Sequence, residues 1–300
     1  MTTFKLDGWL PAQQARVEAL LKSRLEAVAR RSPARLSDAM AYSLLDGGKR
    51  LRPLLCLTFA DAVARASNGG GEPANDAACA LECVHTYSLV HDDLPAMDDD
   101  DLRRGRATNH KVHGEAMAIL AGDALLTEAF AMLAAGPPAE QALRGRLVTE
   151  LALAAGAGGM VGGQVLDIAE DRPAALDYLN RLHRMKTGAL IKAACRMGAV
   201  AAGADERTLE AAEVYGDAVG LAFQIADDLL DVTASTTTMG KPTGADAAAG
   251  RHTFPAVVGL APARALAAEH VARALLAVRE LEGGEGPLAA LARYSIERST

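Results

Sequence analysis

Residues 221–231 read LAFQIADDLLD and set three carboxylates, Asp227, Asp228 and Asp231, in an otherwise apolar run. Asp227 and Asp231 are four positions apart, so on a helix they would lie on one face, one turn from each other. Carboxylates in apolar surroundings are costly unless a positive charge compensates them. The stretch therefore predicts a buried helix that carries a cation site.

A second acidic segment precedes the first, where residues 92–98 read DDLPAMD. On an ideal helix Asp92 and Asp98 would point about 120° apart. Pro95 disfavours regular helix just before itself, and a local break there would bring both carboxylates round one ion. The alternative is a solvated acidic loop, since residues 98–101 are four aspartates in a row. Two clusters facing one cavity suit Mg²⁺, which binds carboxylate oxygens, water and substrate phosphate.

The rest of the chain predicts one all-α domain, residues 1–300. Hydrophobic residues make up 50% of the chain and aromatic residues only 4%, which favours close-packed helices over a sheet sandwich. Apolar residues recur with a helical period, strand-like alternation is absent, and no linker composition divides the chain. The clearest expected helices cover residues 10–29, 51–64, 77–89, 116–135, 143–155 and 209–231.

Composition also argues against several partners. A net charge of -7 without a basic stripe argues against nucleic acid. No 18-residue run is free of charge, so no membrane span is expected. The N-terminus lacks the order of a signal peptide. Four cysteines without a CxxC pair, among them Cys79 and Cys83 at helical spacing, indicate buried thiols and a cytoplasmic setting.

Basic and polar side chains are spread over several segments. Residues 47–53, GGKRLRP, are expected to open a helix with Lys49 and Arg52 on one face, which would favour phosphate oxygens. An ordinary basic loop is the alternative. His85 lies two turns before Asp92 on the same face, which points it into the same cavity. The alternative is an ordinary core histidine. The polar loop 233–250 is a candidate lid or a disordered surface connection.

Six segments occur in the motif order of one enzyme family. They are GGKRLRP (47–53), ECVHTYSLVHDD (82–93), DDDDLRRG (98–105), GGQVLD (162–167), KTGA (186–189) and FQIADDLLD (223–231). Together they resemble the trans-isoprenyl diphosphate synthases, most closely the bacterial farnesyl diphosphate synthases, over residues 35–298. The resemblance implies an isoprenoid-synthase-type helical bundle around a deep central cavity, normally a homodimer. It implies Mg²⁺-dependent condensation of isopentenyl diphosphate with dimethylallyl or geranyl diphosphate, giving farnesyl diphosphate (C15). The same chemistry stopping at C10 or C20 is the alternative.

The resemblance also implies roles for individual residues. Asp92, Asp98 and Asp227 would bind three Mg²⁺ ions, or Mn²⁺, with support from Asp93, Asp228 and Asp231. The residues expected to bind isopentenyl diphosphate are Lys49, Arg52, His85 and Arg104. Those expected to bind the allylic diphosphate are Arg103, Lys186, Thr187, Gln224, Lys241 and Arg251. The six aspartates, Lys186 and Lys241 form the expected catalytic set, and Gln164 and Asp167 would line the cavity. Arg251 replaces the family's usual lysine, so its contact differs in geometry.

Tyr87, with Ser88 beside it, is the expected determinant of product length. Tyr87 lies five residues before Asp92, about 7.5 Å along a helix. A ring at that depth would stop the growing chain, and in the family an aromatic residue here goes with a C15 product. The alternative is that Tyr87 is an ordinary core residue.

Three other functions remain as rivals. A terpene cyclase would share the acidic motif but would not need the cations at 49, 52 and 104. A di-metal oxidase would use Glu82 and His85 as a Glu-x-x-His pair, but it needs a second such motif. A non-catalytic partner subunit would be expected to have lost one acidic cluster.

Overall fold

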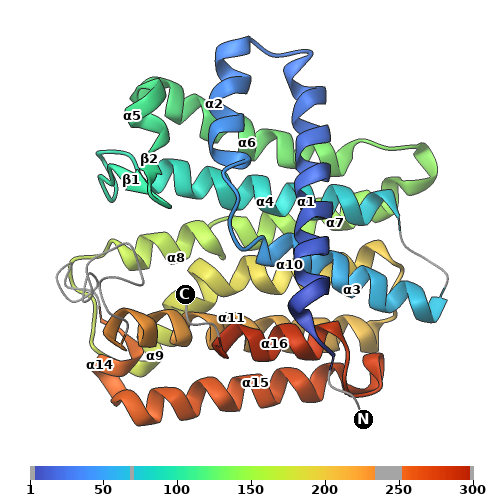
Figure 1. Ribbon diagram of the computed structural model, residues 1–300, viewed down its shortest axis with the longest axis vertical. Coiled ribbons are helices and arrows are strands. Elements are labelled where there is room, and N and C mark those ends of the chain that lie inside the picture. The colour runs from blue at the N-terminus through green and yellow to red at the C-terminus, as the bar shows by residue number, and fades with distance from the viewer. Residues whose placement is uncertain (1–3, 68–70, 234–251, 298–300) are drawn as a thin grey trace.

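The computed structural model describes residues 4–67, 71–233 and 252–297, which are almost entirely helical (Figure 1). The all-α prediction is confirmed. The long helices are α1 Leu6–Ala29, α3 Leu51–Ser67, α4 Glu72–Asp92, α6 Glu115–Ala134, α7 Gln141–Ala155, α10 Ala189–Ala201, α11 Glu206–Thr233 and α15 Leu260–Glu282. The shorter elements are α2 Ala34–Leu44, α5 Asn109–His113, the 3-10 turn η1 Pro138–Glu140, α8 Met160–Asp167, α9 Leu176–His183, the π turn η2 Arg184–Gly188, α14 Phe254–Val258 and α16 Pro287–Glu297.

Helix α10 lies at the centre and packs against α3, α4, α7 and α11. The small residues of the chain allow this close packing. A Cβ at Gly198 on α10 would lie 2.0 Å from the carbonyl oxygen of Cys56 on α3, so only glycine lets the two backbones meet. Around this centre α6 packs on α4 and α15 on α11, while α1 and α2 run across the other helices (Figure 1). Five of the six expected helices lie within observed ones, and the expected helix 116–135 overruns the end of α6 by one residue.

A two-stranded hairpin, β1 Leu102–Arg103 and β2 Arg106–Ala107, interrupts the helices, and no periodic pattern in these residues predicted it. Its turn places Arg104 at φ 51° and Gly105 at φ 76°. Two positive φ values are what a type I′ hairpin turn requires. The turn places Arg104 in the wall of a small pocket that Asp93 also lines.

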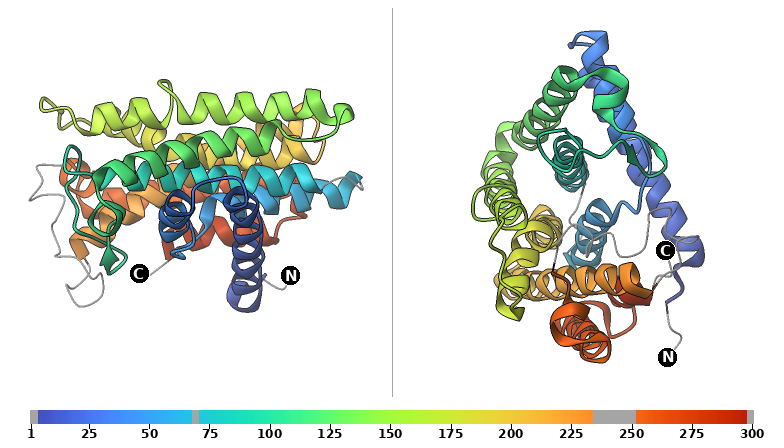
Figure 2. Two further views of the ribbon diagram at one scale, coloured as in Figure 1. Left: turned by 90° about the horizontal axis from the view of Figure 1, so that it is seen from above. Right: turned by 90° about the vertical axis from the view of Figure 1, so that its left-hand side faces the viewer.

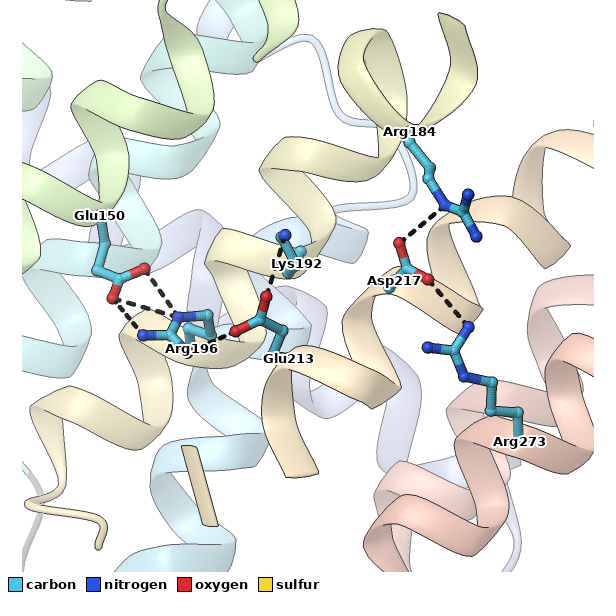
Figure 3. A network of polar contacts seen from close by, with 7 residues as sticks. All are labelled: Glu150, Arg184, Lys192, Arg196, Glu213, Asp217 and Arg273. Atoms are coloured by element: carbon cyan, nitrogen blue, oxygen red, sulfur yellow. Dashed lines mark hydrogen bonds and ion pairs between the residues drawn. The ribbon is translucent and has the colours of Figure 1, made fainter. Parts of the chain in front are cut away.

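A row of ion pairs fastens α10 and η2 to α11 outside the core (Figure 3). Arg196 on α10 lies 2.7 Å from Glu150 and 2.9 Å from Glu213, and Asp217 lies 3.1 Å from both Arg184 and Arg273. Each partly exposed pair contributes about 0–1 kcal/mol, although a network loses less side-chain entropy than isolated pairs. The pairs hold η2, which carries Lys186 and Thr187, in register with α11.

Two expectations about environment can be compared with the structure. All four cysteines are free and buried, as predicted. Among the described residues one helix, α6, is long and apolar enough to cross a membrane, and a third of its most apolar window is buried in the fold. Core helices of globular proteins meet the same test, so length and composition alone do not make α6 a membrane span.

Candidate active site

Helix α4 breaks between Asp92 and Asp98, the two outer carboxylates of the acidic segment 92–98. Helix α4 ends at Asp92, and the backbone N–H of Asp98 donates to the carbonyl oxygen of Asp92 at 2.8 Å. The chain therefore turns back on itself around Pro95, as its proline predicted. Asp98 is exposed, and its carboxylate is close enough to raise the pKa of the Asp92 carboxyl.

Asp92 lies half-buried at the end of α4, and burial raises its pKa to about 6. The Lys186 ammonium opposes this shift and the Asp98 carboxylate adds to it. Gln164 on α8 donates from Nε2 to Asp92 Oδ1 at 2.9 Å. A carboxylate whose ionised form is disfavoured in this way gains most from a bound cation.

Asp93 is turned to the other side of the chain, where it pairs with Arg103. The guanidinium Nε and Nη2 lie 2.8 Å and 2.6 Å from Asp93 Oδ1, and Asp93 is 3% exposed. Burial raises the pKa of Asp93, and the Arg103 guanidinium acts against that rise. Asp93 thus anchors the hairpin to α4.

On α11, hydrogen bonds run from η2 to the start of α14. Thr187 Oγ1 donates to Gln224 Oε1 at 3.2 Å, and Gln224 Nε2 donates to Asp228 Oδ1 at 2.9 Å. The other oxygen of Asp228 accepts from the backbone N–H of Phe254 at 2.9 Å. Asp228 is buried and held by these donors, whereas the half-buried Asp227 lines a cavity. Asp231 is buried one turn further along α11.

Glycines allow three elements to meet at Lys186. A Cβ at Gly163 on α8 would lie 2.2 Å from the backbone nitrogen of Lys186. A Cβ at Gly220 on α11 would lie 2.9 Å from Cα of Gly188. Neither place has room for a side chain, so the GGQ and KTG segments are packed backbone to backbone. Lys186 then reaches Asp167 through an ion pair.

Two cavities open on either side of η2. One, of about 410 Å³, is polar and lined by Arg103, Asp167, Arg172, Tyr178, Leu179, Leu182, His183, Lys186, Thr187, Gln224, Asp227, Asp228, His252 and Thr253. The other, of about 580 Å³, is largely apolar and lined by Arg52, His85, Tyr87, Ser88, Leu89, His91, Asp92, Leu94, Met97, Ile119, Met160, Val161, Gln164, Val165, Ile168, Lys186 and Thr187. Lys186 and Thr187 line both, so a polar chamber adjoins an apolar one.

Basic side chains gather where His85 faces the apolar cavity. His85 and Asp92 line this cavity together, as their two-turn spacing predicted. Burial lowers the pKa of His85 well below its usual value, and Arg52 and Arg104 act in the same direction. His85 is therefore neutral at pH 7 and can donate one hydrogen bond. Burial also lowers the pKa of Arg52, against the attraction of Asp227.

Lys49 and Arg52 do not share a helix face, which corrects the expectation from their spacing. Helix α3 begins only at Leu51, and Arg50 before it has a φ of 49°. That left-handed residue turns the chain, so Arg52 lines the apolar cavity while Lys49 borders a separate small pocket beside Phe223. The side chain of Arg50 contacts Glu18, Glu82 and the carbonyl oxygen of Leu44, all outside residues 47–53.

The Arg104 side chain folds back over the loop that contains Gly47 and Gly48, called here the glycine loop. Its Nη1 donates to the carbonyl oxygen of Gly47 at 2.6 Å. A Cβ at Gly48, whose φ is 107°, would lie 2.7 Å from the Arg104 guanidinium. The loop therefore needs glycine both for its backbone and for this contact. The contact holds Arg104 against the loop that precedes α3.

Some of the remaining expected residues lie in the described part of the chain and others do not. Tyr87 is 8% exposed and lines the apolar cavity with Ser88, whose hydroxyl donates to the carbonyl oxygen of His85 at 2.8 Å. Lys241, Arg251 and most of the loop 233–250 lie outside the described residues.

The polar cavity contains residues that the motifs did not single out. Arg172 Nη1 donates to the carbonyl oxygen of Asp167 at 2.7 Å, and Thr253 and His183 also line the wall. His183 lies three residues before Lys186, so helical spacing could have indicated it. Arg172 follows a loop without periodicity, and only the tertiary structure reveals its place.

His183 should make stability depend on pH. Both ring nitrogens are buried without a hydrogen-bond partner, and burial lowers the pKa of His183 from 6.5 to about 4. Between pH 6.5 and about 4, His183 binds a proton in the unfolded chain but not in the folded one. Stability therefore falls as the pH drops through this range. Urea unfolding at several pH values should show a smaller loss for His183→Asn than for the wild type. Equal slopes would contradict this.

Glu82 has a different role from that of a metal ligand. Arg50 Nη1 donates to Glu82 Oε1 at 2.6 Å, and both side chains are buried. The carboxylate that a Glu-x-x-His metal site would need is thus committed to an ion pair. This contact argues against the di-metal oxidase.

The carboxylates of this site fit a cation that is bound by the protein and by substrate phosphate together. Within residues 4–67, 71–233 and 252–297 no three His, Cys, Asp or Glu side chains already converge on one point. Mg²⁺ commonly uses one or two carboxylates and completes its octahedron with water and phosphate. The two clusters were expected to face one cavity, but Asp92 lines the apolar cavity and Asp227 lines the adjoining polar one. Each carboxylate, with Asp92 disfavoured in its ionised form by burial, is suited to that kind of cation site.

Comparison with known proteins agrees with this geometry. Residues 33–281 match the polyprenyl synthetase family. A farnesyl diphosphate synthase of Escherichia coli is 47% identical, covering 87% of this chain and 89% of that protein. A chloroplastic geranylgeranyl pyrophosphate synthase of Arabidopsis thaliana is 45% identical, covering 88% and 74%. A crystal structure of an FPP/GFPP synthase from Zymomonas mobilis has a TM-score of 0.78 at 36% identity, covering 93% of this chain and 97% of that one. The chain belongs to the polyprenyl synthetase family.

Proposed function

We propose that the protein is a prenyltransferase that condenses isopentenyl diphosphate with dimethylallyl and then geranyl diphosphate to form farnesyl diphosphate. The observation that carries this proposal is the pair of adjoining cavities, one polar and one apolar, that share Lys186 and Thr187. A diphosphate group suits the first, and a growing hydrocarbon chain suits the second. The farnesyl diphosphate synthases among the relatives support it.

In this reaction the C–O bond of the allylic diphosphate breaks, the double bond of isopentenyl diphosphate attacks the allylic carbon, and a proton leaves the new product. Lys186, Thr187 and Arg103 face the departing diphosphate and stabilise its charge. His85, Arg52 and Arg104 would hold the diphosphate of isopentenyl diphosphate. The proton goes to the released diphosphate, the nearest strong acceptor. The apolar walls keep water away from the cation.

Three Mg²⁺ ions, or Mn²⁺, are proposed to be held by Asp92, Asp98 and Asp227, with Asp93, Asp228 and Asp231 in support. When bound, they neutralise negative charge on the leaving diphosphate. Asp228 supports by fixing Gln224 and the start of α14, and Asp93 supports by fixing Arg103. Lys241 and Arg251 are proposed as further allylic-diphosphate ligands on the family pattern.

We also propose a homodimer working in the cytoplasm. Helices α6, α7 and α8 lie along one side of the molecule (Figure 2) and expose apolar side chains there. The exposed residues on these helices are Ile119, Leu120, Leu153, Val161 and Val165. Three of them, Ile119, Val161 and Val165, also line the apolar cavity. Exposed apolar residues on neighbouring helices are a feature of interfaces between subunits. Free, buried thiols suit a reducing compartment.

The test is incubation of the purified protein with Mg²⁺, isopentenyl diphosphate and dimethylallyl diphosphate, followed by separation of products by chain length. A dominant C15 product is expected. A C10 or C20 product would keep the chemistry and reject the proposed stopping point. Absence of condensation, with substrate shown to bind, would favour a non-catalytic partner subunit instead.

Tyr87→Ala should lengthen the product to C20 or beyond. Tyr87 is almost fully buried in the wall of the apolar cavity, and its replacement by alanine opens space beyond the C15 position. The measurement is the C20 to C15 ratio at equal substrate consumption. If C15 remains the sole product, Tyr87 does not limit the chain.

A further inference from the structure

His91 lies beside Tyr87 in the wall of the apolar cavity. The two are four residues apart on α4, so they share a helix face. Their ring centroids are 5.7 Å apart at an interplanar angle of 83°, an edge-to-face arrangement. Such a contact favours one orientation of both rings over others. The orientation of Tyr87 therefore depends on where His91 is held.

Helix α6 fixes the position of His91 from the other side. The His91 Nε2 lies 3.0 Å from the carbonyl oxygen of Ile119, so the tautomer protonated at Nε2 donates to it. One turn along the helix, a Cβ at Gly122 would lie 2.1 Å from the same nitrogen. The ring thus occupies space that any other residue at position 122 would fill.

The glycine at 122 needs a packing reason. It lies inside α6, where glycine is less favourable than alanine by about 1 kcal/mol. It is not among the glycines with positive φ, so its backbone conformation does not demand it. The reason that the structure offers is the imidazole of His91, which is seated against the bare backbone of Gly122.

We infer that His91 is a positioning residue for product length: its ring, seated in the gap at Gly122, holds the Tyr87 ring across the apolar cavity. His91, Tyr87 and Ile119 all line this cavity. Without the imidazole, Tyr87 loses its lateral contact and turns aside more easily under a growing chain. His91 acts through Tyr87 and makes no contact with the reacting carbon atoms.

The experiment compares four variants with the wild type by product length. His91→Ala removes the ring, and Gly122→Ala expels it from its seat. Both should raise the C20 to C15 ratio about two- to tenfold, the range that one edge-to-face contact represents. His91→Phe retains a ring against Tyr87 and should keep C15 dominant. The matched control is Gly145→Ala on α7, where a Cβ meets nothing within 4 Å.

A double variant shows whether His91 acts through Tyr87. In Tyr87→Ala the ring that His91 positions is already gone, so adding Gly122→Ala should leave the product distribution unchanged. An additive shift would overturn the inference. So would an unchanged C20 to C15 ratio in both His91→Ala and Gly122→Ala.

Because this role rests on the proposed function, total isopentenyl incorporation is scored separately from product length. If the wild type incorporates no isopentenyl units, the proposed function fails. If it makes C15 and the variants make the same product mixture, the chemistry stands and the role of His91 fails.

Discussion

Asp92→Asn is expected to lower the rate of isopentenyl condensation by about 10²–10³, the typical cost of losing one electrostatic contributor to a transition state. Asparagine keeps the shape of the side chain and the oxygen to which Gln164 donates at 2.9 Å. It removes only the charge that a cation would need. Asp227→Asn, in the adjoining polar cavity, should behave in the same way.

Stability should move differently from activity in Asp92→Asn. Burial raises the pKa of Asp92 to about 6, so its ionised form destabilises the fold at pH 7. The neutral asparagine should therefore leave the free energy of unfolding unchanged or higher. A fall in rate together with lower stability would indicate a damaged fold and would not support a metal-binding role.

The measurement is steady-state turnover with dimethylallyl diphosphate, with urea unfolding of each variant. Asp38→Asn is the matched control, because Asp38 is exposed on α2 and outside both cavities. It should turn over like the wild type. Near-wild-type turnover of Asp92→Asn would remove the basis for assigning this carboxylate to the metal.

The sequence was most informative where a single element decides the geometry. The apolar period of α11 put Asp227 on a buried face, and Pro95 ended α4 so that Asp98 returns to Asp92. These effects are local, since a helical period and a proline act within a few residues. Six motifs in order then identified the fold, and the family match agrees.

The sequence did not predict side-chain positions that depend on contacts between segments far apart in the chain. The spacing of Lys49 and Arg52 suggested one helix face, but Arg50 takes a left-handed conformation between them. The packing of the His91 ring against Gly122 depends on how α4 packs on α6. Nothing in the sequence indicated that these two residues are in contact. Such contacts join residues far apart in the chain, which no periodic pattern records.

Arg50→Met is expected to lower the free energy of unfolding by about 3–5 kcal/mol, because it leaves a buried charge without its partner. Arg50 is 3% exposed and Glu82 is 2% exposed. The Arg50 guanidinium lies 2.6 Å from Glu82 and 2.7 Å from Glu18, and it donates to the carbonyl oxygen of Leu44 at 2.8 Å. Together these contacts join α1, α2, α3 and α4 at the start of the glycine loop.

A second substitution, at Glu82, distinguishes the effect of an unpaired buried charge from the effect of lost packing. Arg50→Met with Glu82→Met removes both charges, and a buried pair replaced by apolar side chains is often tolerated. The double variant should therefore recover much of the stability that Arg50→Met loses. Arg207→Met is the control, since Arg207 pairs with Glu280 at the surface and should show no measurable change.

Urea unfolding at constant m-value gives each free energy, and the double-mutant cycle gives the coupling between Arg50 and Glu82. A loss below about 1 kcal/mol for Arg50→Met would place this pair with ordinary surface ion pairs. A large loss with partial recovery means that the buried Arg50–Glu82 pair, which joins distant segments, stabilises the chain at the start of α3, between Lys49 and Arg52.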